Sequence, residues 1–183
     1  AEAQALAAEI GGLAVQADVA AVADIRRLFD AAEAAYGPVD ILVNNAGVAS
    51  FQSVAESTEG QYDRIFSVNA RGTYFCCREA ALRLRDGGRI VSISTGATVA
   101  SPAGSAIYSG SKAAVEQLTR ALARELGARG ITVNTVSPGF TDTDMLNQFP
   151  QLVSIAAGMS PLGRVGAPKD VADVVAWLCT DEA

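Results

Sequence analysis

The segment Tyr108-Ser109-Gly110-Ser111-Lys112 contains two groups that could transfer a proton. Residues four apart on a helix share one face, so the phenol and the ammonium would lie together. An unperturbed tyrosine titrates at about 10, and a neighbouring positive charge lowers that pKa. The pair could therefore act as a general acid or base at neutral pH. The spacing alone is weak support, because such a tyrosine and lysine usually lie on a solvated helix face.

Composition restricts the other chemistries. The 183 residues include no histidine, which excludes Ser-His-Asp and Cys-His catalytic systems and histidine-based zinc sites. Any acid or base must then be Asp, Glu, Lys, Tyr or Cys. The acidic residues do not cluster at metal-ligand spacing, so we expect no metal site. The formal charge of −6, without a basic block, argues against a nucleic-acid partner.

The number and spacing of the cysteines indicate a reducing compartment. Cys76, Cys77 and Cys179 form no Cys-x-x-Cys motif, and such an odd, sparse set is typical of a reducing environment. No apolar run is long enough to cross a membrane, and the N-terminal residues lack the pattern of a signal peptide. We therefore expect a cytoplasmic protein without a membrane partner.

Hydrophobic periodicity alternates along the chain between the strand and the helix pattern. We expect strands at 13–19, 39–43, 89–94 and 131–136. We expect helices at 2–10, 20–36, 58–84, 106–127 and 168–180, and an irregular segment at 140–166. This alternation predicts an α/β fold, a doubly wound parallel sheet of Rossmann-like type, as one domain over residues 1–183.

Small and polar residues follow the predicted strands. In open α/β sheets, ligands bind beyond the carboxyl ends of the strands, so these residues are candidates for a site. The strand ends read Asp18-Val19, Asn44-Asn45-Ala46-Gly47, Ser94-Thr95-Gly96 and Ser137-Pro138-Gly139. Four such ends are harder to explain by chance than any one of them.

Taken in order, these motifs resemble the short-chain dehydrogenase/reductase family. They are NNAG, Asn69 in VNARG, GRIVSIST, YSGSK and PGFTDTDM, and the resemblance covers essentially the whole chain. The detail is most similar to the branch of 3-oxoacyl-[acyl-carrier-protein] reductases and many bacterial alcohol or sugar dehydrogenases. A Tyr-x-x-x-Lys motif alone is not specific, but the set in this order and spacing is.

The resemblance implies four catalytic positions. Tyr108 would be the general acid or base, and Lys112 would lower its pKa and bind the nicotinamide ribose. Asn69 would hold a water that joins Lys112 to solvent. The family usually has a serine thirteen residues before the tyrosine to bind the substrate oxygen, where this chain has Thr95. Threonine also offers a hydroxyl, so we prefer Thr95, with Ser94 as the alternative.

The resemblance also implies a nicotinamide cofactor, NAD or NADP, and a small-molecule carbonyl or secondary alcohol as substrate. The adenosine side of the cofactor would contact Asp18, Val19, Asn45, Ala46 and Gly47. The nicotinamide side would contact Tyr108, Lys112, Pro138, Gly139, Thr141 and Thr143. The helices at 58–84 and 106–127 would pair across a two-fold axis and give a homodimer or homotetramer.

One departure from the family pattern affects the functional expectation. No Gly-rich turn precedes residue 13, so by the resemblance the chain lacks the first βαβ portion and the last strand. The strand end that selects NAD or NADP would be absent with it. We expect an oxidoreductase that transfers a hydride. The alternative is a non-catalytic dinucleotide-fold remnant that acts as a binding or assembly module. The 183 residues alone are expected to bind NAD(P)H weakly and to aggregate.

Overall fold

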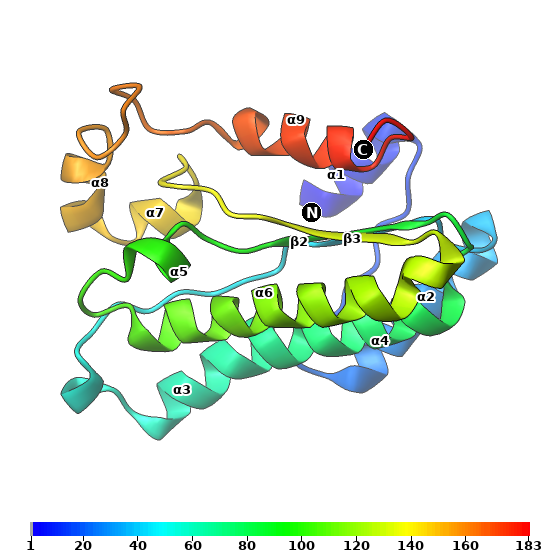
Figure 1. The fold of residues 1–183 in the computed structure, drawn as a ribbon, viewed down its shortest axis with the longest axis horizontal. Coiled ribbons are helices and arrows are strands. Elements are labelled where there is room, and N and C mark those ends of the chain that lie inside the picture. The colour runs from blue at the N-terminus through cyan, green and yellow to red at the C-terminus, as the bar shows by residue number, and fades with distance from the viewer. Residues whose placement is uncertain (1) are drawn as a thin grey trace.

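A computed structural model describes residues 2–183, and a parallel β-sheet lies at its centre (Figure 1). The strands are β1 (Ile41–Asn44), β2 (Arg89–Ile93) and β3 (Thr132–Val136), in the order β1-β2-β3. Val43 pairs with Val91, which pairs with Asn134 on its other side. Because parallel neighbours need crossover connections, helices separate the strands in sequence. The predicted α/β fold with a parallel sheet is confirmed.

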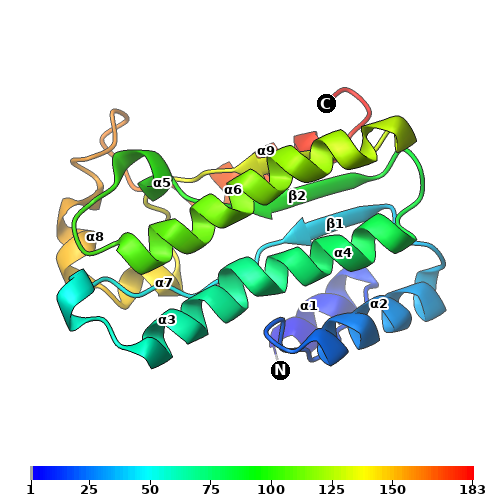
Figure 2. The same ribbon diagram turned by 60° about the horizontal axis from the view of Figure 1, so that its bottom comes forward.

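The helices form layers on the two faces of this sheet (Figure 2). One face is covered by α2, α4 and α6, and the other by α9. The longer helices are α1 (Glu2–Ile10), α2 (Val22–Tyr36), α3 (Glu59–Phe66), α4 (Thr73–Arg83), α6 (Ala106–Leu126) and α9 (Pro168–Leu178). The short ones are η1 (Val54–Glu56), η2 (Ser67–Gly72), α5 (Ala97–Ala100), η3 (Gly127–Arg129), α7 (Asp144–Asn147) and α8 (Pro150–Ala156).

The hydrophobic core lies between the sheet and α2, α4 and α6. Ile90 of β2, Phe29 of α2 and Leu122 of α6 belong to this cluster, and all three are buried. Both Ile90 and Val91 are fully buried although they point to opposite faces of the sheet. Burial on both faces explains why two apolar residues, Ile90 and Val91, stand next to each other in β2 rather than alternating with polar ones.

The expected strand at 13–19 is wrong. Residues 12–18 have no regular secondary structure, and Leu13 is half exposed. A strand is defined by ladder hydrogen bonds to a neighbour, and alternation of apolar residues does not supply them. Among residues 2–183, β1 has one hydrogen-bonded neighbour, β2. Ile41 and Val43 of β1 are 43% and 42% exposed, so this edge of the sheet is poorly covered.

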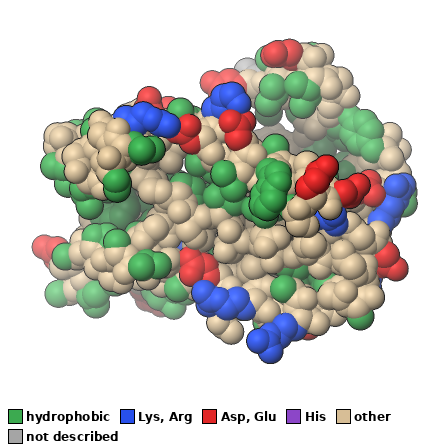
Figure 3. All heavy atoms as spheres, turned by 45° about the horizontal axis from the view of Figure 1, so that its top comes forward, with side chains coloured by type: hydrophobic (Ala, Val, Ile, Leu, Met, Phe, Trp, Pro, Cys, Tyr) green, Lys and Arg blue, Asp and Glu red, His purple; other side chains and the backbone are tan. Residues whose placement is uncertain are grey.

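Two further expectations were too simple. The single helix expected at 58–84 consists of α3 and α4 with a π-helical segment, η2, between them. The segment expected to be irregular at 140–166 contains α7 and α8. The helix expected at 168–180 is present as α9, which buries none of its residues fully. Figure 3 looks onto the α9 side and shows hydrophobic side chains spread over that surface.

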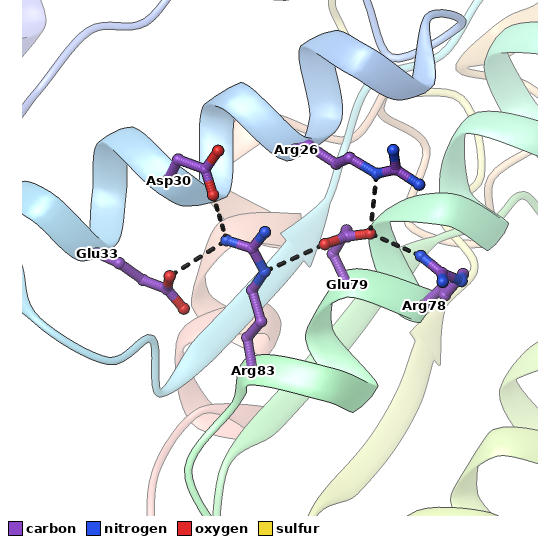
Figure 4. Close-up of polar contacts among 6 residues, drawn as sticks. All are labelled: Arg26, Asp30, Glu33, Arg78, Glu79 and Arg83. Carbon is purple, nitrogen blue, oxygen red and sulfur yellow. Dashed lines mark hydrogen bonds and ion pairs between the residues drawn. The ribbon is translucent and has the colours of Figure 1, made fainter.

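An ion-pair network joins α2 to α4 (Figure 4). Its members are Arg26, Asp30, Glu33, Arg78, Glu79 and Arg83. Glu79 is 3% exposed, and the Arg83 Nε lies 3.1 Å from its Oε2. A buried carboxylate needs such partners because desolvation of the charge is unfavourable. The network therefore fixes the register of the two helices.

None of the helices in residues 2–183 is both long enough and apolar enough to cross a membrane. The same part of the chain has no cluster of three or more potential metal ligands.

Candidate active site

The two proton-transfer candidates lie on the first turns of α6, at the carboxyl end of the sheet (Figure 1). Tyr108 and Lys112 are 8% and 5% exposed, whereas Gly110 between them is exposed. Their face of the helix therefore points inward, as four-residue spacing requires. The solvated helix face that such spacing usually indicates is not found here.

The π-helical segment η2 positions Asn69. Asn69 is fully buried, and its Oδ1 accepts a hydrogen bond of 2.9 Å from the Val48 N–H. Its Nδ2 donates to the Val48 carbonyl at 2.9 Å and to the Ser111 hydroxyl at 3.0 Å. Asn69 thus ties the loop after β1 to α6, next to Lys112. π-Turns occur frequently at functional sites, and the apolar periodicity of residues 58–84 gave no sign of this one.

The Lys112 ammonium lies between the ends of β1 and β2. Its Nζ donates to the Ile93 carbonyl at 2.8 Å. On the other side, a Cβ added at Gly47 would lie 3.2 Å from Nζ and 3.5 Å from the Asn69 Oδ1. A side chain at position 47 would therefore push against the ammonium, which explains the glycine at the end of NNAG.

Burial changes the pKa values of both groups. Burial raises the pKa of Tyr108, and a hydrogen bond with Thr95 partly offsets the rise. Burial lowers the pKa of Lys112 to about 8. The Tyr108 pKa was expected to be lowered by Lys112, and in this structure it is not. The Lys112 ammonium donates to the Ile93 carbonyl instead, and the hydrogen bond with Thr95 only limits the rise in the pKa of Tyr108.

The structure separates the roles of Ser94 and Thr95. Ser94 is 3% exposed and donates its hydroxyl to the Glu116 Oε1 at 2.6 Å. Thr95 is less buried, contacts Tyr108 and accepts a hydrogen bond of 3.2 Å from the Ala97 N–H. The hydroxyl beside the phenol is thus that of Thr95, which supports Thr95 over Ser94 as the group that binds a substrate oxygen.

An aromatic cluster stands beside Tyr108. The Phe51 ring packs edge-on against Tyr108 with centroids 5.5 Å apart, and against Phe149 with centroids 4.9 Å apart. Phe51 was not expected at the site from the sequence. Phe51 follows the NNAG motif in a segment without a periodic apolar pattern. Only its closeness in sequence to that motif could have indicated a place beside Tyr108.

The expected cofactor-contacting residues fall into two groups. Pro138 accepts a hydrogen bond of 2.8 Å from the Gly96 N–H, which joins the ends of β2 and β3. Thr141 and Thr143 donate their hydroxyls to the Gly139 and Thr141 carbonyls, each at 3.3 Å. These residues continue directly from β3 at the catalytic end.

The second group is more exposed to solvent than the buried catalytic side chains. Asn45 and Ala46 are exposed. Asp18 is exposed too, and its Oδ1 accepts a hydrogen bond of 2.9 Å from the Ala20 N–H. The Val19 carbonyl lies 2.9 Å from the position of a Cβ added at Gly72. The structure therefore brings Gly47, Asn69, Thr95, Tyr108 and Lys112 together, and leaves Asp18 and Asn45 open to solvent.

The arrangement favours proton transfer over nucleophilic catalysis. The pKa values of Cys76 and Cys77 are raised to about 11 and about 12, because burial disfavours the thiolate. A phenol beside a hydroxyl and near a buried ammonium can protonate or deprotonate an oxygen held by Thr95. A redox change at the carbon that bears this oxygen would need a cofactor.

Comparisons with known proteins agree with this chemistry. A family model described as enoyl-(acyl carrier protein) reductase matches residues 1–183. A short-chain dehydrogenase from Passalora fulva is 42% identical, over 93% of this chain and 69% of its own length. A versicolorin reductase from Emericella nidulans is also 42% identical, over 93% of this chain and 70% of its own length.

Solved structures give the same result. A short-chain dehydrogenase from Burkholderia cenocepacia, in complex with NADP, superposes with a TM-score of 0.93 at 38% identity. It is covered over 76% of its length by 98% of this chain. A double mutant of a Serratia marcescens short-chain dehydrogenase/reductase superposes with a TM-score of 0.92 at 37% identity, over 99% of this chain and 76% of its own.

Proposed function

Because this chain belongs to the short-chain dehydrogenase/reductase family, we propose that Tyr108, Lys112, Asn69 and Thr95 form the catalytic group of an NAD(P)-dependent oxidoreductase. The reaction interconverts a carbonyl compound and a secondary alcohol. The observation that carries this assignment is the convergence of the four side chains at one end of the sheet, where Tyr108 contacts Thr95 and Asn69 bonds the residue before Lys112. Family membership supplies the reaction class and the expected roles, and the geometry supports them.

The residues present fit a nicotinamide cofactor, which supplies or accepts the hydride. The Lys112 ammonium carries further N–H donors besides the one that bonds Ile93, and these suit ribose hydroxyls. Gly47 leaves the space above Nζ free of a side chain. Pro138, Gly139, Thr141 and Thr143 would hold the nicotinamide, and Asn45, Ala46, Asp18 and Val19 the adenosine. Two structural relatives, both from Burkholderia cenocepacia, carry NADP, which favours NADP.

In the reductive direction, Tyr108 donates its proton to the carbonyl oxygen as negative charge develops there. Thr95 donates a hydrogen bond to the same oxygen and fixes its place beside the phenol. Lys112 stabilises the resulting phenolate through its charge once its amine is directed toward the bound ribose. Asn69 holds the loop after β1 in place and would orient the water that returns a proton to the site.

The substrate side is apolar and aromatic. Phe51 packs against Tyr108, and Phe149 packs against Phe51, so a substrate whose carbonyl reaches the phenol would lie near these rings. Apolar or aromatic carbonyl compounds fit that surface better than charged ones. The three free cysteines are consistent with a cytoplasmic enzyme, and pairing of α3, α4 and α6 with a second copy would give a homodimer or homotetramer.

The test is cofactor consumption by the complete protein with NADPH or NADH and a panel of aryl and alkyl ketones. Tyr108→Phe keeps the ring packing on Phe51 and removes the proton. We expect turnover to fall by about 10²–10⁴-fold, with the affinity for NADPH almost unchanged. A variant with wild-type rates would refute the role of Tyr108. Cofactor binding without any turnover in the wild type would favour the non-catalytic binding module instead.

A further inference from the structure

Glu116 is an acidic residue that has no role in the proposed catalytic group, although it lies directly beside that group. It follows Tyr108 and Lys112 on the next turn of the same face of α6. Its side chain is 16% exposed, which is low for a carboxylate. The nearest positive charge is Arg120, whose Nη2 lies 3.7 Å from the Glu116 Oε2 and is itself largely exposed. This distant, solvated partner does not account for the burial of Glu116.

The Glu116 Oε1 instead accepts hydrogen bonds from two hydroxyls. The Ser94 Oγ donates at 2.6 Å and the Thr98 Oγ1 at 2.8 Å. The Thr98 hydroxyl also lies 2.9 Å from the Thr95 carbonyl, but it has a single proton to donate. A bond to a carboxylate is stronger than one to a neutral carbonyl, so Glu116 is the preferred acceptor.

These two hydroxyls lie on either side of Thr95. Ser94 directly precedes it at the end of β2, and Thr98 follows it in α5. The Glu116 carboxylate therefore holds the residues on both sides of Thr95, whose hydroxyl contacts Tyr108. Glu116 and Tyr108 both belong to α6. The distance between the Thr95 and Tyr108 hydroxyls is thus set through a single helix and two short hydrogen bonds.

We propose that Glu116 is a positioning residue, which places the Thr95 hydroxyl against Tyr108 by holding Ser94 and Thr98 on α6. The inference rests on the proposed function for its effect on turnover, but its structural content can be tested without turnover. Small displacements of a catalytic hydroxyl cause large losses in rate. Loss of the carboxylate should therefore reduce kcat much more than it changes the KM for the cofactor.

The experiment compares Glu116→Ala with Glu116→Gln in the complete protein, with Glu125→Ala as the matched control on an exposed position of the same helix. The glutamine keeps an oxygen that can accept both hydroxyls. We expect kcat to fall about tenfold or more in Glu116→Ala, and to stay within about threefold in Glu116→Gln and Glu125→Ala. The KM for NADPH should change by less than about twofold in all three.

A double-mutant cycle with Thr95→Ala separates positioning from general destabilisation. If Glu116 acts through Thr95, its removal has little further effect once the Thr95 hydroxyl is gone. If the double variant loses kcat by the product of the two single losses, the proposal is overturned. If Glu116→Ala does not fold, Thr98→Val takes its place, because it removes one of the two donors without changing the side-chain shape. Its loss should be smaller and should also vanish in the Thr95→Ala background.

A second measurement needs no substrate. The Tyr108 phenol can be titrated by ultraviolet difference absorbance, with Tyr108→Phe as the blank for the other tyrosines. Because the Thr95 hydrogen bond lowers the pKa of Tyr108, its displacement in Glu116→Ala should move the titration to higher pH, and Glu116→Gln should not. Unchanged titration in Glu116→Ala would overturn the inference. If the wild type has no turnover but Glu116→Ala still shifts the Tyr108 titration, only the proposed function is overturned.

Discussion

The catalytic end of the site and the part expected to hold the adenosine differ in burial and in pairing. Asn69, Ser111 and Lys112 are nearly or fully buried, and each makes a hydrogen bond to a group from another element. Asp18 and Asn45 are exposed, and the Asp18 carboxylate accepts a bond only two residues away. The fold itself therefore organises the catalytic end.

This difference follows from the physics of polar groups. A buried polar side chain without a partner is strongly unfavourable, so burial requires that every partner be placed by the fold. An exposed polar side chain forms its hydrogen bonds with water until a ligand replaces that water. Substitutions at the catalytic end should consequently change rate strongly, whereas substitutions at the adenosine end should change cofactor affinity modestly.

The largest effect is expected from Lys112→Met, which removes the buried ammonium and keeps the side-chain length. Turnover should fall by about 10²-fold or more, because the phenolate loses its neighbouring charge, and the KM for NADPH should rise. Fixed-time assays with NADPH would measure both. Turnover close to wild type would show that the catalytic end does not depend on this buried charge.

The same variant tests the pH dependence of stability. The pKa of Lys112 falls from 10.5 to about 8 in the folded protein, so between these values the unfolded chain binds more protons. Its contribution to the free energy of unfolding therefore rises as the pH increases from about 8 to 10.5. Lys112→Met should lack this rise. Urea denaturation of both proteins at several pH values would show it, and parallel curves would contradict the burial of the amine.

The next effect is expected at Thr95. Thr95→Ala should lower kcat by about 10²-fold through loss of the bond to the substrate oxygen, and Thr95→Ser should keep or improve activity. Ser94→Ala removes one of the two hydroxyls held by Glu116 and should cause a smaller loss. Steady-state kinetics of the three variants would rank them. A greater loss in Ser94→Ala would show that Ser94 holds the substrate oxygen.

Gly47→Ala should have a smaller effect, with a characteristic pattern. The new Cβ would lie 3.2 Å from the Lys112 Nζ, which is the mobile end of a long side chain and can move aside. We expect little change in melting temperature and a loss of about tenfold in kcat/KM. Calorimetry and kinetics together would test this, and a large drop in stability would instead indicate a clash with the backbone.

The smallest effect is expected at the adenosine end. Asp18→Ala should weaken NADPH binding by about two- to tenfold, as for one hydrogen bond of modest net strength, and should leave kcat unchanged. Calorimetric titration of the complete protein would measure it. A change in kcat would mean that the two ends of the site are coupled more tightly than their burial indicates.

The sequence predicted the central parallel strands well, and failed where tertiary contacts decide. β2 and β3 were expected within a residue of their bounds, because β-branched residues recur along both segments. Residues 13–19 alternate as a strand would, but within residues 2–183 they have no ladder partner, so no strand forms. The hydroxyl at position 95 was chosen from family spacing, but the contacts of Ser94 with Glu116 could be seen only in three dimensions.

The π-helical segment η2 sets the angle about the helix axis at which α4 follows α3. One extra residue within a helix rotates everything after it by about 100°. With the present number of residues in η2, Ile65 of α3 and Cys76 and Ala80 of α4 all face inward. Deletion of one residue between 67 and 72 should therefore turn the buried face of α4 away from the core along its whole length. Loss of one residue from the exposed turn at 158–163 would leave the rest of the chain in register.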